Sequence, residues 1–98
     1  MISPIYLKKL RKFLRKNLIR LVALATSVIT YGTISEYLLE RNAPGTGVKS
    51  LFDSLWFVMQ TITTVGYGDT PVVTLWGRAN ALVLMVFGIG IIGFLVLV

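Results

Sequence analysis

Residues 63–69 read Thr-Thr-Val-Gly-Tyr-Gly-Asp, and this heptad lies between two long apolar segments of the chain. The first segment, residues 18–39, has no charged residue from position 21 to position 35, and the second, residues 75–98, has none after Arg78. A helix needs about twenty mainly apolar residues to cross a bilayer. The pattern therefore predicts an all-α membrane protein in which two transmembrane helices flank the heptad.

A shorter apolar stretch, residues 50–63, precedes the heptad. As a helix it would cover roughly 20 Å, whereas the hydrocarbon core of a bilayer is about 30 Å thick. We expect this helix to enter the membrane and turn back, with Ser50 as its N-cap and Asp53 in the capping-box position. Thr74 is the N-cap candidate of the second transmembrane helix. Residues 40–49 contain Gly and Pro and are predicted to form a loop.

The composition excludes several classes of protein. The chain has 98 residues, 55% of them hydrophobic, and it contains neither cysteine nor histidine. It therefore lacks the residues for disulfide frameworks, thiolate nucleophiles, Cys-ligated zinc and imidazole bases. A soluble domain of this size would leave a large apolar surface in water. We expect a membrane protein that is not an enzyme.

Positive charge is concentrated near the N-terminus. The formal net charge is +6, and no acidic residue precedes Glu36. Flanks rich in Lys and Arg stay cytoplasmic, which predicts a plasma-membrane protein with both termini in the cytoplasm and no nucleic-acid partner. Residues 1–17 are expected to form an interfacial segment that binds anionic lipids; a topology signal alone is the alternative. Seven of the ten cations precede position 21: Lys8, Lys9, Arg11, Lys12, Arg15, Lys16 and Arg20.

Two charged residues fall inside the first apolar segment. Arg20 and Glu36 lie near its opposite ends, where long side chains can reach the polar interface of the membrane. We therefore expect both side chains to snorkel toward water.

The heptad is expected to place an extended backbone at membrane depth. Unpaired peptide groups cost several kcal/mol there unless they are buried in protein or face a path for water or ions. Gly66 and Gly68 can adopt positive φ at no steric cost, and an alternating backbone would let the carbonyls of residues 64–67 point to one side. A row of such oxygens can replace the hydration shell of a cation.

Residues 64–68, Thr-Val-Gly-Tyr-Gly, match the signature filter of potassium channels, and the chain resembles this family over roughly residues 20–98. The resemblance is most specific at residues 63–69. It implies an outer helix, a turret loop, a re-entrant pore helix, a selectivity filter and an inner helix. In this chain those elements correspond to residues 18–39, 40–49, 50–63, 64–68 and 75–98.

The resemblance extends to residues on both sides of the filter. Trp56 and Phe57 stand where the family has an aromatic pair on its pore helix, and Asp69 follows the filter as it does in the family. Residues 74–78 resemble the start of the inner helix in bacterial two-helix members. Gly88 matches the glycine of the inner-helix gating hinge, although close helix packing is an equal explanation for a glycine there.

The family's architecture implies how this chain would bind K⁺. Four identical chains would surround one axis, so the partners would be three further subunits and the lipid bilayer. Dehydrated K⁺ would be held by the backbone carbonyls of Thr64, Val65, Gly66 and Tyr67 and by the hydroxyl of Thr64, with Gly68 completing the filter. Residues expected to support the filter are Trp56, Phe57, Gln60, Thr63 and Asp69.

Three of these positions carry more specific expectations. Tyr67 is expected to pack against the aromatic pair, and its presence favours K⁺ over Na⁺ because related non-selective channels often change this residue. Asp69 is expected to face Trp56 or the outer mouth of the pore. Some bacterial members have Glu at the position of Gln60, paired with the aspartate, so the amide of Gln60 is expected to couple more weakly. Whether the filter inactivates as in those members is left open by this difference.

Three other functions are compatible with the sequence. The first is a weakly selective cation channel on the same fold, the second a K⁺ transporter subunit, and the third a non-conducting membrane anchor whose loop matches by chance. The gating stimulus cannot be deduced from the residues. Because Val98 follows Gly88 so closely and without a cationic flank, we expect that a cytosolic regulatory domain is missing after it.

Overall fold

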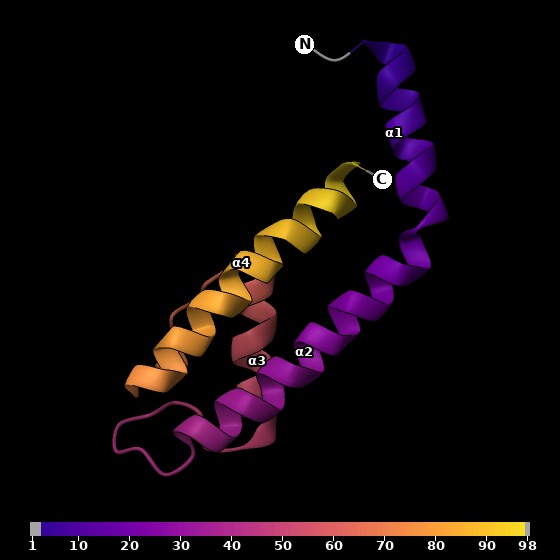
Figure 1. The fold of residues 1–98 in the computed structure, drawn as a ribbon. Helices are drawn as coiled ribbons and strands as arrows, with labels where there is room; N and C mark the ends of the chain where they lie inside the picture. The colour runs from indigo at the N-terminus through magenta and orange to yellow at the C-terminus, as the bar shows by residue number, and fades with distance from the viewer. Residues whose placement is uncertain (1–2, 98) are drawn as a thin grey trace.

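A computed structural model describes residues 3–97, which form four helices (Figure 1). They are α1 (Pro4–Lys16), α2 (Leu18–Glu40), α3 (Leu51–Ile62) and α4 (Leu75–Leu97). By length and composition α2 and α4 can cross a membrane, and α3 is a shorter apolar helix between them. The predicted all-α fold with two candidate transmembrane helices is confirmed. The predicted segments 1–17 and 75–98 also include positions 1, 2 and 98, which lie outside the described residues.

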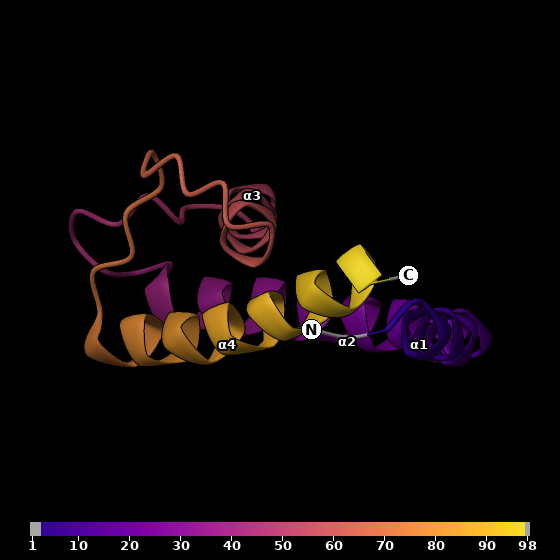
Figure 2. The ribbon, with the colours of Figure 1, turned by 90° about the horizontal axis from the view of Figure 1, so that it is seen from above.

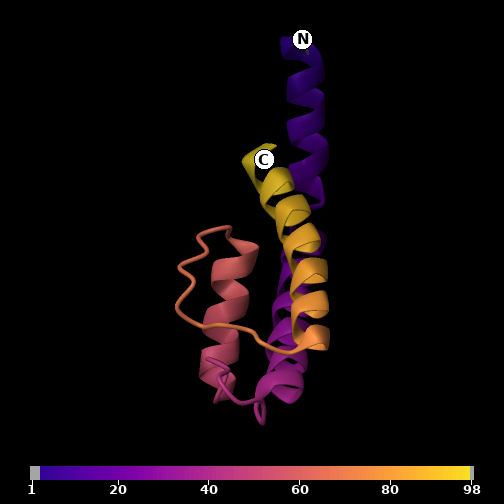
Figure 3. The same cartoon turned by 90° about the vertical axis from the view of Figure 1, so that its left-hand side faces the viewer.

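The helices form two layers. α2 and α4 run antiparallel side by side, and α3 packs against the same face of both (Figure 1, Figure 2). Figure 3 shows the segment after α3 running back along that helix toward the start of α4. The heptad therefore lies beside α3, on the face of the α2 and α4 pair that carries this helix.

A small apolar core lies between α2, α3 and α4. Val58 of α3 and Leu84 of α4 are completely buried. A Cβ atom at Gly32 of α2 would lie 2.9 Å from Leu84 Cδ2 and 3.1 Å from Val58 Cγ2, so a larger residue here would require these side chains to shift. The remaining buried apolar residues of this cluster are Val28, Ile62 and Ile91.

Large apolar side chains cover the outside of the chain. Phe52, Trp76 and Val86 are each more than 70% exposed in the isolated chain. Scattered apolar residues on a surface are ordinary, but so many on helices of this length are covered by lipid or by other chains. The fold is therefore complete only in a membrane or an assembly.

Side-chain caps define the ends of the later helices. The Oγ of Ser50 accepts a hydrogen bond from the N–H of Asp53 at 3.1 Å, and the Oγ1 of Thr74 accepts one from the N–H of Gly77 at 2.9 Å. Both predicted N-caps are confirmed. The carboxylate of Asp53 accepts from the N–H of Lys49 at 3.2 Å, one residue before the cap.

The basic N-terminal segment is a separate helix. Ser3 caps α1, and the Nδ2 of Asn17 donates to the carbonyl of Phe13 at 2.8 Å where α1 ends and α2 begins. Leu14 is the buried residue of α1, whereas its Lys and Arg side chains are exposed. Figure 1 shows α1 extending beyond the end of α4.

The expectation that Glu36 would snorkel toward water is wrong. Its side chain is completely buried between α2 and α4, and its Oε1 accepts a hydrogen bond from the Nδ2 of Asn80 at 3.0 Å. The polar partner comes from the facing helix, so the side chain turns inward. Arg20, at the other end of α2, is exposed as expected.

Candidate ion-binding site

The backbone of the heptad alternates in handedness. Thr64, Gly66 and Gly68 have φ values of 65°, 59° and 75°, whereas Val65 and Tyr67 between them do not have positive φ. Only glycine adopts this conformation without steric cost. The alternation expected for the two glycines is present and extends one step earlier, to Thr64. A backbone of this kind can aim successive carbonyls toward one side.

Thr64 is the strained residue of the segment. A β-branched residue at positive φ costs about 1–3 kcal/mol and persists only where its surroundings hold it. Here the N–H of Thr64 donates to the carbonyl of Thr61 at 3.2 Å, and the N–H of Gly66 donates to the carbonyl of Gln60 at 3.1 Å. The last turn of α3 therefore holds the beginning of the heptad. In the sequence, Thr64 lies two positions before Gly66, as Gly66 does before Gly68, and this spacing could have predicted its positive φ.

Asp69 is the hydrogen-bonding centre at the other end of the heptad. The Nε1 of Trp56 donates to both of its carboxylate oxygens, at 3.1 and 3.2 Å, and the Nε2 of Gln60 donates to Oδ1 at 3.0 Å. The hydroxyl of Thr70 donates to the same oxygen at 3.2 Å. The hydrogen bonds from Gln60 and then Trp56 hold the pKa of Asp69 below its usual value. Residue 60 is therefore directly coupled to Asp69 by its amide.

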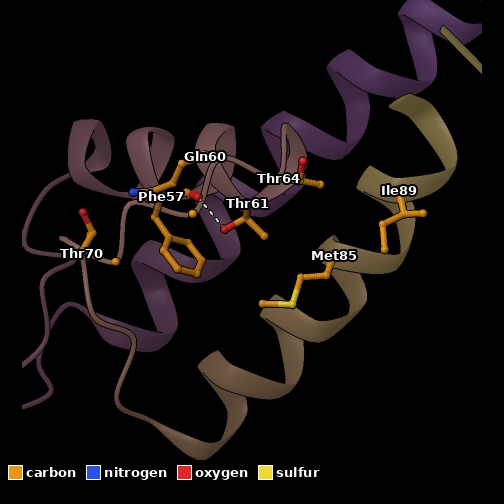
Figure 4. Close-up of a pocket in the computed structure, with 9 residues that line it drawn as sticks. Phe57, Gln60, Thr61, Thr64, Thr70, Met85 and Ile89 are labelled. Carbon is orange, nitrogen blue, oxygen red and sulfur yellow. Dashed lines mark hydrogen bonds between the residues drawn. The ribbon is translucent and has the colours of Figure 1, made fainter. Parts of the chain in front are cut away.

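The two aromatic residues of α3 lie in different surroundings. The ring of Trp56 stacks on that of Tyr67, with centroids 5.8 Å apart and planes 4° from parallel. Phe57 instead lines a cavity of about 380 Å³ together with Thr61, Met85 and Ile89 (Figure 4). Within one chain the structure thus brings Trp56, but not Phe57, to the tyrosine of the heptad.

The outer surface of the heptad is open in the single chain. Val65 is 53% exposed and Tyr67 is 67% exposed. On the opposite side, Thr64, Gly66 and Gly68 border the cavity between the heptad and α4. The heptad is thus held by hydrogen bonds at both of its ends, whereas Val65 and Tyr67 between them are exposed. Thr63, one of the predicted support residues, uses its hydroxyl to donate to the carbonyl of Met59 at 2.7 Å at the end of α3.

A buried carboxylate that the sequence analysis did not identify fastens the loop after the heptad. Glu40, the last residue of α2, is completely buried. Its Oε1 accepts from the N–H of Val73 at 2.7 Å and from the hydroxyl of Thr46 at 2.9 Å, and its Oε2 accepts from the N–H of Thr74 at 2.8 Å. A Cβ at Gly77 would lie 2.5 Å from that Oε2, so glycine leaves room for the carboxylate.

Gly88 packs against the end of α3. A Cβ atom at this position would lie 2.8 Å from the Cα and 2.9 Å from the carbonyl oxygen of Ile62. A side chain here would therefore collide with backbone, so close packing requires a glycine whether or not α4 bends at this position. Gly90 and Gly93, further along α4, have open space where a Cβ would be.

Several proteins of similar sequence are named potassium channels. A calcium-gated potassium channel of Thermoplasma volcanium is 44% identical over 66 residues, which is 67% of this chain and 19% of that protein. A voltage-gated potassium channel of Aeropyrum pernix is 37% identical over 69% of this chain and 23% of its own length. A cyclic nucleotide-gated potassium channel of Mesorhizobium japonicum is 33% identical over 80% of this chain and 22% of its own length. The chain thus spans about a fifth of these relatives.

Most of the chain matches one protein family. The pattern of the ion channel family matches residues 20–98, from the beginning of α2 to the C-terminus, and it includes the whole heptad and its supports. With this match over most of its length, the chain belongs to the ion channel family.

Proposed function

We propose that the chain is the pore-forming subunit of a homotetrameric, K⁺-selective channel that conducts K⁺ passively. The observation that carries this proposal is the alternating φ of Thr64, Gly66 and Gly68 within Thr-Val-Gly-Tyr-Gly. A backbone of alternating hand can direct the carbonyls of residues 64–67, with the hydroxyl of Thr64, toward a dehydrated K⁺. Such a site performs no covalent chemistry, so the proposed protein is not an enzyme.

The names of the relatives support K⁺ as the ion. The three described above are all named potassium channels, but their names give three different stimuli: calcium, voltage and a cyclic nucleotide. What these proteins share with this chain is therefore the conducting part. The stimulus of this protein would therefore be sensed outside the shared segment.

The geometry of coordination requires more than one chain, and the resemblance to potassium channels implies four. A single heptad offers oxygens from one side, and a dehydrated cation needs oxygens all around it. The open outer surface of Val65 and Tyr67 and the exposed apolar faces of α2 and α4 leave room for neighbouring chains. Four copies around one axis would complete the filter and cover these faces.

The end of α3 supports cation binding without an acidic side chain. α3 ends at Ile62, directly before the heptad, with Thr63 as its C-cap. A helix C-terminus carries about half a negative charge. Four such ends near one axis would stabilise a cation below the filter. Asp69, Trp56 and Gln60 would maintain the shape of its outer end.

The surroundings of the channel complete the proposal. It would reside in the plasma membrane with both termini in the cytoplasm, and the exposed cations of α1 would lie against anionic lipid headgroups. α4 would bend near Gly88 when the pore opens.

The test measures ion currents of the purified full chain in planar bilayers. We expect unitary K⁺ currents and a bi-ionic reversal potential that favours K⁺ over Na⁺. A reversal potential near zero would instead identify the weakly selective cation channel, and flux without unitary steps would identify a transporter subunit. Absence of any K⁺ flux would contradict the proposal and favour the membrane anchor.

A matched pair of glycine substitutions connects the currents to the heptad. Gly66 and Gly45 both have positive φ, 59° and 82°, and open space at the Cβ position. Alanine therefore introduces the same kind of backbone strain at both positions. We expect Gly66→Ala to abolish K⁺ selectivity or conduction and Gly45→Ala, in the loop before α3, to preserve both. Equal effects of the two substitutions would contradict the assignment of the filter.

A further inference from the structure

Asn80 connects α4 to α2 through three hydrogen bonds. Its Nδ2 donates to the Oγ of Ser35 at 2.9 Å and to the Oε1 of Glu36 at 3.0 Å, and its Oδ1 accepts from the hydroxyl of Tyr31 at 2.7 Å. Both amide hydrogens are therefore in use. Asn80 is itself only 8% exposed. This polar cluster lies inside the contact between two candidate transmembrane helices.

The carboxyl group of Glu36 is incompletely satisfied within this cluster. The residue is completely buried, and its Oε2 is inaccessible and has no hydrogen-bond partner among residues 3–97. Its other oxygen has the amide of Asn80 as donor. A buried carboxylate normally requires several donors or a paired cation.

Glu40, one turn further along the same helix, shows what an ionised buried carboxylate requires. Both of its oxygens accept hydrogen bonds, from two backbone N–H groups and a hydroxyl. Such donors stabilise a negative charge. The two buried glutamates of α2 therefore differ in the number of donors that could stabilise a negative charge.

The charged and titratable groups around Glu36 do not compensate a charge on it. On α2 the charged group that interacts with Glu36 is Glu40, which is another carboxyl group. The phenol of Tyr31, also on α2, donates its hydrogen bond to Asn80. The one titratable residue of α3 is Asp53, which accepts from the N–H of Lys49. The one cation of α4 is Arg78, whose Nε donates to the carbonyl of Val72 at 3.0 Å.

The enclosure of Oε2 restricts what can bind to it. Because the atom is covered by this chain alone, neither a lipid, a second subunit nor a hydrated ion can reach it. A proton fits. We propose that Glu36 is a proton-binding site in the contact between α2 and α4, with the proton on Oε2 and with Oε1 as the carbonyl oxygen that accepts from Asn80. Protonation leaves one hydroxyl without an acceptor, which costs less than a buried charge beside Glu40.

Loss of the proton from Glu36 would weaken the contact between α2 and α4. When Glu36 gives its proton to water, a second negative charge appears one turn from Glu40 within the same contact. Repulsion and desolvation then oppose the packing of α2 on α4. Alkaline conditions would therefore weaken the attachment of the proposed inner helix to the outer one, whichever ion passes through the pore.

The first test detects the proton directly. The full chain has four carboxyl side chains, so the infrared carbonyl band of a protonated carboxyl group can be assigned by substitution. At neutral pH in liposomes we expect this band in the parent protein, its loss in Glu36→Gln, and its persistence in Glu40→Gln and Asp53→Asn. A parent protein without the band, as when a trapped water solvates an ionised Glu36, or a band that survives Glu36→Gln, overturns the proposal.

The second test needs no correctly folded variant. If the native state keeps a proton that the unfolded chain releases near about pH 4.3, the native state binds more protons, and its stability falls as the pH rises. As the pH is raised from about 5 into the alkaline range, the band of the parent protein should disappear, and its thermal midpoint should fall over the same interval. Where Glu36→Gln folds, its midpoint should change less over that interval. A band that persists unchanged, or a midpoint that rises as the band is lost, contradicts the proposal.

Discussion

The Oε2 of Glu40 accepts a hydrogen bond from the N–H of Thr74 at 2.8 Å, and this contact joins the last residue of α2 to the N-cap of α4. The other oxygen of Glu40 holds Val73 and Thr46. The end of α2, the loop six positions further on and the segment more than thirty positions further on therefore meet at one buried carboxylate. The loop that follows the heptad is fastened here, so the position of Asp69 and its neighbours depends on a residue outside the heptad.

Removal of this carboxylate should destabilise the protein strongly. Glu40→Ala would leave the part-buried N–H groups of Val73 and Thr74 without their acceptor, and the hydroxyl of Thr46 would keep only its 3.4 Å contact with the carbonyl of Pro71. Each hydrogen bond to a charged group contributes about 1.5–3 kcal/mol. We expect a fall in the thermal midpoint of the purified protein and a loss of K⁺ selectivity. The control is Arg41→Ala, the next residue, which is exposed. Equal midpoints for the two variants would show that Glu40 is not a structural anchor.

Asp69 should make the outer end of the heptad sensitive to acid. Its pKa is lowered by hydrogen bonds in the folded protein, so the stability that it contributes is present above the pKa of the unfolded chain and is lost as the pH falls through the folded value. The chain has two tryptophans. In a Trp76→Phe background the emission of Trp56 should therefore change on acidification below about pH 4.

The matched control for this titration is Asp69→Asn. An asparagine retains an acceptor oxygen for Trp56 and Gln60 but has no carboxyl group to titrate. The acid-dependent change in Trp56 emission should be absent from this variant. A change that persists in Asp69→Asn would assign the transition to another carboxyl group.

Local patterns in the sequence predicted the elements that depend on local physics. The lengths of the apolar segments predicted α2 and α4, and the hydroxyls of Ser50 and Thr74 predicted where α3 and α4 begin, because an N-cap needs only its own first turn. The positive φ of Gly66 and Gly68 followed from the absence of a side chain. These features require no knowledge of distant contacts.

Contacts between distant segments were the part that local patterns could not predict. The sequence predicts Glu40 only as the first residue of a loop. Its role as an anchor could not be predicted, because its partners, Val73 and Thr74, lie more than thirty positions away. Glu36 was expected to reach water because no sequence rule pairs it with Asn80 on a facing helix. The available signal was that Asn80 is a lone amide in an otherwise apolar segment, and such a residue needs a polar partner.

The contact of Gly32 with Leu84 should tolerate only a small side chain. In Gly32→Ala the new methyl group would lie 2.9 Å from a terminal methyl of Leu84, which is tight but involves a flexible side chain. We expect a loss of about 1–3 kcal/mol. Leu84→Val in the same protein should recover part of it, because the side chain becomes shorter. A double-mutant cycle of thermal midpoints measures this coupling, and strictly additive effects would contradict direct contact.

Substitutions along α4 should separate packing from bending. Gly88→Ala would force a Cβ against the backbone of Ile62, so it should lower the thermal midpoint and displace the end of α3 whether or not α4 bends there. Gly90→Ala and Gly93→Ala meet no such obstacle, and removing a glycine from a helix can stabilise it by up to about 1 kcal/mol.

Single-channel open probability, measured beside the thermal midpoint, distinguishes the two roles. If α4 bends beyond its contact with Ile62, Gly90→Ala and Gly93→Ala should raise the midpoint and lower the open probability, because a stiffer helix opposes bending. If bending is confined to Gly88, these two variants should keep the open probability of the parent protein. A change in gating by Gly88→Ala alone carries no weight, since the displaced end of α3 adjoins the heptad and would alter conduction by itself.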